Sequence, residues 1–191
     1  MKKLFLVLAI IFSVKISSNA QTADFRGFSW GSSLSKVQSD EKSSLQIKAG
    51  DDELLYKDVL GGADCDVVYI FNDNDKLESG MYIFSKKYSN PQLYLQDYTK
   101  FKILLIQKYG KPVNEKEYWR NNTPLTEKHN YGQAITDGNL SMNTVWNTER
   151  SSVKIELITT NNHPSLQIHY TARSLDELEN KTDLKNALGK L

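Results

Sequence analysis

One short acidic segment carries the kind of oxygen atoms that a calcium ion binds. Asp73-Asn74-Asp75 is followed closely by Glu78. A calcium loop supplies about six to eight oxygens and usually has a glycine at its sharp turn. The segment from Asn72 to Glu78 has too few ligands and lacks that glycine. Its Asn- and Asp-rich composition is typical of a turn, so we expect a hairpin turn here and no metal site.

Three histidines and a single cysteine are the other residues that could bind zinc or attack a substrate. A zinc site needs two ligands at helical or strand spacing and a third from elsewhere, and His129, His163 and His169 do not have this spacing. Cys65 could form a nucleophilic pair with a histidine, but nothing in the sequence places the two together. A small buried strand residue is the simpler interpretation of Cys65.

Several familiar catalytic motifs are missing as well. The chain contains no phosphate-binding glycine loop, no H-E-x-x-H and no C-x-x-C. Asp64 and Asp66 flank Cys65 and face one way, either as an acidic patch or as a solvated strand face. We therefore predict no catalytic residue, no metal and no cofactor, and the sequence leans against an enzyme.

The aromatic residues are the most suggestive feature. Five of them fall on or beside predicted strands: Tyr56, Tyr69, Tyr82, Trp119 and Trp146. On a water-facing sheet they would form a binding surface for a protein, a peptide or a glycan. Alternatively, they fill the layer between the sheet and its helices. A long polar loop at 120–139 is a second candidate surface.

The first twenty residues have the features of a cleavable signal peptide. Lys2 and Lys3 precede an apolar run that begins at Leu4 and is shorter than the roughly 20 residues that a membrane-spanning helix needs. Ser18-Asn19-Ala20 supplies small residues for cleavage after Ala20. We expect an exported protein, periplasmic or secreted, with no stable membrane anchor.

Removing this leader changes the charge of the chain. The leader holds three lysines and no acidic residue, so the mature chain has 21 basic and 23 acidic side chains and a net charge of about −2. This charge does not favour nucleic acid or anionic lipid as a partner. The single cysteine also excludes an internal disulfide, so packing must supply the stability.

The first half of the mature chain predicts a short helix followed by strands. Ser32 or Ser33 can cap a helix that ends near Ser43. Strands are expected at 45–49 and 53–60. Residues 63–86 alternate with period two on both sides of an Asn/Asp-rich turn, which predicts a β-hairpin.

The second half begins with the clearest helix of the sequence. Asn90 is a candidate N-cap, Pro91 suits the first position, and apolar residues recur at helical spacing from Tyr94 to Tyr109. Strands are expected at 113–119, 142–146, 153–157 and 166–170. Ser174 and Glu177 form a capping box, S-x-x-E, at the start of a final helix over 174–189.

This order of elements predicts an α+β fold in a single globular domain over 21–191. We expect two tandem helix-plus-antiparallel-sheet units, about 27–89 and 90–173, with the helices packed on one sheet face and the other face partly open. The C-terminal helix follows them.

The segment from Phe25 to Val37, with its Trp30-Gly31 turn into a short helix, resembles the opening of small exported bacterial α+β proteins, as does the exit Tyr109-Gly110-Lys111-Pro112. Tandem helix-plus-sheet units are similar to the β-lactamase-inhibitor-protein-like architecture, whose single-unit relatives include small outer-membrane assembly lipoproteins. The resemblance implies a protein-binding module without catalysis. It carries over no site residue, and the anchor cysteine of the lipoproteins is missing.

Together these features favour an exported, non-enzymatic binding or protein-interaction module. Its partner would be an envelope or extracellular protein, docked on the open sheet face or on the loop at 120–139. The alternative is a small-ligand carrier or hydrolase with a pocket between helix 91–109 and the sheet.

Overall fold

The computed structural model describes residues 23–48, 52–120, 131–175, 184 and 187–189. The predicted signal peptide and most of the predicted C-terminal helix lie outside these residues. Within the described part, no helix is both long enough and apolar enough to cross a membrane.

The strands form two antiparallel meanders. The first contains β1 (Ser44–Lys48), β2 (Glu53–Leu60), β3 (Ala63–Phe71) and β4 (Leu77–Phe84). The second contains β5 (Asn114–Trp119), β6 (Leu140–Asn147), β7 (Ser151–Thr160) and β8 (His163–Ala172). Residues of β3, β4, β7 and β8 alternate between buried and more exposed positions, as strands with one covered face do.

The two meanders are joined into one continuous eight-stranded sheet, in the order β1-β2-β3-β4-β8-β7-β6-β5. The seam is the antiparallel pairing of β4 with β8, which runs from Ser79 opposite Thr171 to Phe84 opposite Leu166. The expectation of two tandem helix-plus-sheet units is therefore wrong. Local alternation predicts strands, but it carries no information about which distant strand will be the neighbour, so the sequence did not reveal this seam.

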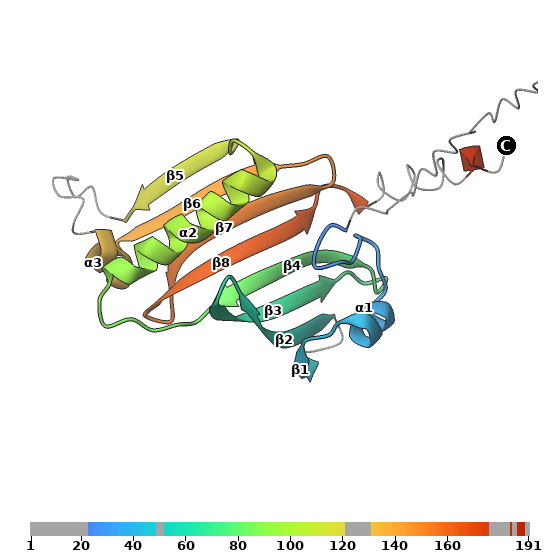
Figure 1. Ribbon diagram of the computed structural model, residues 1–191, viewed down its shortest axis with the longest axis horizontal. Helices are drawn as coiled ribbons and strands as arrows, with labels where there is room; N and C mark the ends of the chain where they lie inside the picture. The colour runs from blue at the N-terminus through green and yellow to red at the C-terminus, as the bar shows by residue number, and fades with distance from the viewer. Residues whose placement is uncertain (1–22, 49–51, 121–130, 176–183, 185–186, 190–191) are drawn as a thin grey trace, which may run out of the picture.

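Three described helices accompany the sheet (Figure 1). Helix α1 (Leu34–Asp40) is capped by the Ser33 side chain. Helix α2 (Gln92–Tyr109) lies across the second meander and buries the stripe Tyr94, Tyr98, Phe101 and Leu105. The short helix α3 (Tyr131–Thr136) lies inside the segment that the sequence suggested was a loop.

The core lies on one face of the sheet, which we call the covered face. Tyr98 of α2 shares a 2.7 Å hydrogen bond with Thr144 of β6, and the ring of Phe101 packs against Phe84 of β4. The hydroxyl of Thr159 in β7 donates to the carbonyl of Ile135 in α3. These contacts place α2 and α3 on the same side of the sheet.

The lead-in, residues 23–33, crosses the seam on the covered face. Phe25 packs edge-on against Tyr69 and Tyr82 of the first meander and tilted against Tyr170 of β8. The indole N–H of Trp30 donates to Ser151 of β7 at 2.9 Å. The lead-in thus fastens the two meanders to each other.

Gly80 of β4 makes room for this clamp. A Cβ added at Gly80 would lie 2.3 Å from ring carbons of Phe25, so any larger side chain would push the ring off the seam.

We expect Gly80→Ala to lower the free energy of unfolding by about 1–3 kcal/mol, because it overpacks the site beneath Phe25. Chemical denaturation of the mature chain measures this. Ser79→Ala, one residue away on the opposite face, is the matched control. Equal denaturation midpoints for Gly80→Ala and wild type would show that Phe25 is not held against this strand.

Candidate functional site

Four of the five aromatic residues that the sequence suggested as a binding surface lie in the core. Tyr56, Tyr69, Tyr82 and Trp146 are buried, and only Trp119 is partly exposed. Tyr69 and Tyr82 surround Phe25. These positions correspond to the other interpretation of the rings, in which they fill the layer between the sheet and the elements that cover it.

A partly buried cluster of charges lies beside these rings, centred on Arg26. The backbone of Arg26 has a φ of 48°, a left-handed conformation that is uncommon for a residue other than glycine. Its guanidinium lies 3.1 Å from Glu41 and 2.6 Å from Asp58. It also donates to the Ser43 hydroxyl and lies 5.7 Å from the centre of the Tyr82 ring. The side chain thereby connects the lead-in, the end of α1 and strand β2.

Charge pairing in this cluster controls the titration of Glu41. Burial would raise the pKa of Glu41, but hydrogen bonds from Arg26 and Tyr69 outweigh it and lower the pKa to about 2. Burial and the hydrogen bond to Glu41 also raise the pKa of Tyr69. The carboxylate therefore remains charged while buried, which holds Arg26 in place.

Cys65 lies next to the same cluster and is buried. Burial, together with the charge of Asp58, raises the pKa of its thiol to about 11. Because the thiolate is the nucleophilic form, this environment disfavours reactivity.

The other metal-binding candidates are dispersed over the fold. Asn72 to Lys76 form the turn between β3 and β4, where the Asn72 side chain accepts hydrogen bonds from the backbone of Asn74 and Lys76. His163 is exposed at the start of β8, and His169 lies further along that strand. His129 falls outside the described residues. In the described part, no three His, Cys, Asp or Glu side chains gather closely enough to hold a metal ion.

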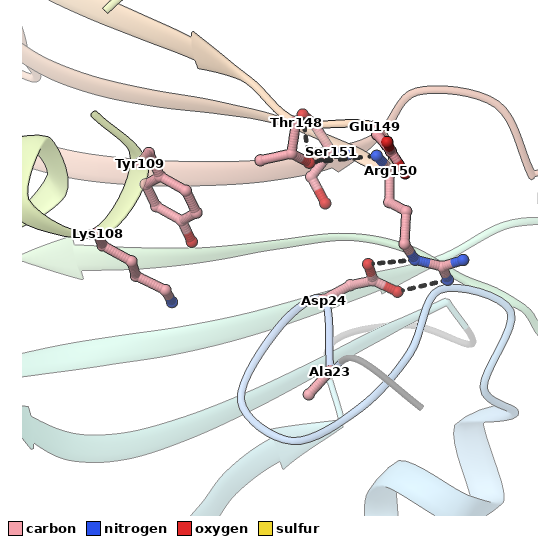
Figure 2. Close-up of a pocket in the computed structure, with 8 residues that line it drawn as sticks. All are labelled: Ala23, Asp24, Lys108, Tyr109, Thr148, Glu149, Arg150 and Ser151. Carbon is pink, nitrogen blue, oxygen red and sulfur yellow. Dashed lines mark hydrogen bonds and ion pairs between the residues drawn. The ribbon is translucent and has the colours of Figure 1, made fainter. Parts of the chain in front are cut away.

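A cleft of about 310 Å³ opens where α2 ends, between the lead-in and the β6–β7 turn (Figure 2). Its walls are Ala23, Asp24, Lys108, Tyr109, Thr148, Glu149, Arg150 and Ser151. Further along α2, the interface with the sheet is filled by the buried stripe of the helix. The cleft is thus confined to the C-terminal end of α2.

Two charged side chains of this cleft, Asp24 and Arg150, already form an ion pair with each other. Arg150 binds both carboxylate oxygens of Asp24, at 2.7 and 2.8 Å, and Asp24 also accepts from the backbone N–H of Trp30. The Ser151 hydroxyl accepts from Trp30 and has no base beside it among the described side chains. The ion pair and hydrogen bonds that line the cleft therefore hold the lead-in against the second meander, and they leave few polar groups free for catalysis.

The larger candidate surface is the opposite side of the sheet, which we call the open face. In Figure 1 no described helix lies on it. Its apolar part spans three strands, because Leu55, Val68 and Met81 stand opposite one another in register. Leu55 and Met81 are half-buried, and Val68 between them is 9% exposed. Ile70 and Ile83 extend the same side by two residues along β3 and β4.

Beside this apolar strip lies a group of fixed polar side chains on β7 and β8. Glu156 binds Lys154 at 2.8 Å and His169 at 2.9 Å, and Gln167 lies 3.0 Å from the same histidine nitrogen. Burial would raise the pKa of Glu156, but hydrogen bonds from His169 and Lys154 outweigh it and lower the pKa to about 2. The open face thus presents an apolar strip next to an ordered charged strip.

The sequence pattern does not single out the residues of this face, because no one of them is unusual. Leu55, Val68 and Met81 look like ordinary strand residues. The available signal was that the outward positions of the 63–86 hairpin are also apolar, as at Val68 and Met81.

Neither a protein-family model nor a curated protein matches this chain. Among solved structures, the chain is similar to a DUF4309 family protein from Bacillus subtilis, with 12% sequence identity and a TM-score of 0.37. The alignment covers 74% of this chain and 79% of that one.

The Arg26 cluster predicts acid sensitivity. The pKa of Glu41 lies near 2 in the folded chain and near 4.5 when unperturbed. Its contribution to stability is therefore present above about pH 4.5 and is lost as the pH falls through about 2. We expect Glu41→Gln to be less stable than wild type at pH 6, with a difference that shrinks by about 2–3 kcal/mol by pH 2.

Denaturant titrations at a series of pH values measure this difference. Glu149→Gln, which removes an exposed carboxylate, should show a nearly constant and small difference over the same range. A Glu41→Gln difference that does not change with pH would mean that the carboxylate is not paired in the folded protein.

Proposed function

We propose that this protein is an exported, non-enzymatic interaction module that docks another protein on its open face. The observation that carries the proposal is the apolar strip of Leu55, Val68 and Met81, with Ile70 and Ile83, on a sheet face that no described helix covers. The apolar leader motivates the export, and the mature chain would then meet its partner outside the cytoplasm.

The two strips of the open face suit a protein partner. Apolar side chains at the centre of an interface supply binding energy, while flanking charges contribute specificity and orientation. Lys154, Glu156 and His169 are already held by one another. The free-energy cost of ordering these side chains when a partner binds would therefore be small. Of the aromatic residues with described side chains, Tyr118 at the sheet edge is the exposed one on this side.

Docking at the edge strand β5 is less favourable than docking on the open face. An unpaired edge can add a strand from another chain, and charged residues on the edge oppose this. Strand β5 carries Glu115, Lys116 and Glu117 in succession, all exposed. The face, and not this edge, is therefore the surface that we assign to the partner.

The loop expected at 120–139 is the other docking candidate from the sequence. Its residues 131–136 form α3, whose Ile135 is buried. A deletion that removed α3 would damage the core, so this candidate is best tested by replacing only residues 122–129 with a Gly/Ser linker.

A charge placed in the apolar strip tests the proposal. Met81→Glu should weaken capture of a protein from the chain's own envelope fraction at least about tenfold, because the carboxylate would be buried without a partner at the interface. The matched control is Val113→Glu, an equally drastic change at an exposed position outside the open face. Thermal unfolding establishes that both variants are folded.

A photo-crosslinking side chain at position 81 or 113 then locates the contact. We expect a crosslinked partner from position 81 only. Capture that is the same for Met81→Glu and wild type, crosslinks from position 113 alone, or no specific protein retained by wild type would each contradict the proposal.

A further inference from the structure

Helix α2 buries one side against the sheet and exposes apolar side chains on the other. Phe101 and Leu105 are buried, and because a helix turns about 100° per residue, Ile103 between them points away from the sheet. Ile103 is 50% exposed, Leu104 45% and Ile106 37%. A shallow hollow of about 400 Å³ continues from Ile103 toward the N-terminal end of the helix. We call the three exposed aliphatic residues, 103, 104 and 106, the α2 ridge.

The exposed charges of α2 all have the same sign. Of the exposed residues in this helix, Lys100 and Lys108 are charged and none is acidic. Lys100 donates to the backbone carbonyl of Gly61 at 2.6 Å, and Lys108 lies over the rings of Tyr109 and Tyr170. Neither lysine has a carboxylate partner among the described side chains, so both keep their positive charge uncompensated beside the ridge.

The acidic side chains near α2 belong to its flanks and not to its ridge. Asp97 is half-buried and accepts a hydrogen bond from Tyr88. Glu115 and Glu117 extend from the edge strand β5, where Glu115 forms an ion pair with Lys102 of the helix. The outermost surface of α2 is therefore apolar and basic.

This combination of apolar and basic groups decides which occupant suits the ridge. A second copy meeting through the same ridge would bring the positive charges of two identical helices together, which opposes a symmetric contact. The ridge is aliphatic and has none of the Trp, Tyr or Arg anchors that dominate the binding energy of protein interfaces.

An anionic lipid surface matches both properties of the ridge. Its headgroups offer negative charge to the lysines, and its acyl region accepts the aliphatic side chains. Lysine stems can lie along apolar surface while their ammonium groups stay at the headgroups. The net charge of the mature chain, about −2, acts only weakly against this attraction, because salt screens charges that are more than about 8–10 Å away.

We propose that the α2 ridge binds the surface of an anionic phospholipid bilayer, with the helix parallel to the membrane plane and Lys100 and Lys108 among the headgroups. Helix α2 covers the side of the sheet opposite to the open face (Figure 1). A bilayer at the ridge therefore leaves the open face free, and the inference does not rest on a protein partner there.

Vesicle flotation of the mature chain, residues 21–191, tests the proposal. The probes are vesicles of phosphatidylcholine alone and vesicles in which about one-third of the lipid is phosphatidylglycerol. We expect binding to the anionic vesicles to be at least about tenfold stronger, and to weaken as the salt concentration rises.

Substitution at the ridge tests its apolar contribution. Ile103→Asn should weaken binding to the anionic vesicles at least about fivefold, because the apolar area that enters the membrane is lost. The matched control is Val59→Asn, at a position that is 58% exposed and lies on the open face, on the same side of β2 as Leu55. Neither change alters the net charge, and thermal unfolding establishes that both variants are folded.

A second pair of variants tests the role of the lysines. Lys100→Gln combined with Lys108→Gln should remove most of the preference for anionic vesicles. Lys36→Gln combined with Lys57→Gln removes the same charge from side chains that are 58% and 54% exposed elsewhere on the chain. This control should bind the vesicles as wild type does.

An environment-sensitive dye then locates the contact. The dye attached at Leu104→Cys should shift to the blue with anionic vesicles, whereas the dye at Val59→Cys should not. Cys65 is buried and stays unlabelled in the folded chain. Equal binding to the two kinds of vesicle, no binding, equal losses for Ile103→Asn and Val59→Asn, or a shift from position 59 alone would each overturn the proposal.

A dye response at position 104 without vesicles would overturn it as well. If that response grew with the concentration of the chain itself, the ridge would belong to a contact between two copies. If it appeared on adding soluble envelope proteins, the ridge would belong to a protein partner.

Discussion

The pairing of β4 with β8 is the constraint on which the rest of the structure depends. Among the described strands it is the pairing that joins the two meanders, from Ser79 opposite Thr171 to Phe84 opposite Leu166. On the covered face the lead-in crosses this seam, with Phe25 seated over Gly80 and between rings of both meanders. The ion pair of Asp24 with Arg150 fixes the same segment at its start. The β4–β8 pairing makes the sheet continuous, and the lead-in reinforces this seam from the covered face.

Because the lead-in and α2 pack on one side only, the two faces of the sheet differ in composition and in exposure. The covered face contains nearly all of the large aromatic residues, packed with α2 and the lead-in, and it provides the stability that a chain without a disulfide must obtain from packing. The open face is left with smaller apolar residues such as Leu55 and Val68 and with the ordered group around Glu156. Such a surface is broad, with an apolar strip beside an ordered charged one.

Local features of the sequence predicted local structure well. The helix at 91–109 and the hairpin at 63–86 are present because periodicity, caps and turn residues act over a few positions. Interactions between distant residues were not predictable. Nothing in the order of elements indicates that β4 pairs with β8, and the Arg26 cluster unites residues 15 and 32 positions further along the chain, Glu41 and Asp58. Helix α3 was missed because its six residues are too few for a clear pattern, and its Gly132 is needed where the helix touches the backbone of Pro91. The aromatic residues were located on the right strands, but a period of two cannot tell which face will be covered.

The most direct test of this account is whether the two meanders fold as one unit. Residues 21–89 and 90–191 can be produced separately and examined by calorimetry, alone and mixed. A single sheet sealed by the lead-in predicts that neither fragment unfolds cooperatively by itself, and that mixing them restores one cooperative transition. Two fragments that each unfold cooperatively alone, with no change on mixing, would contradict the account, because the continuous open face would then not be a property of the folded chain.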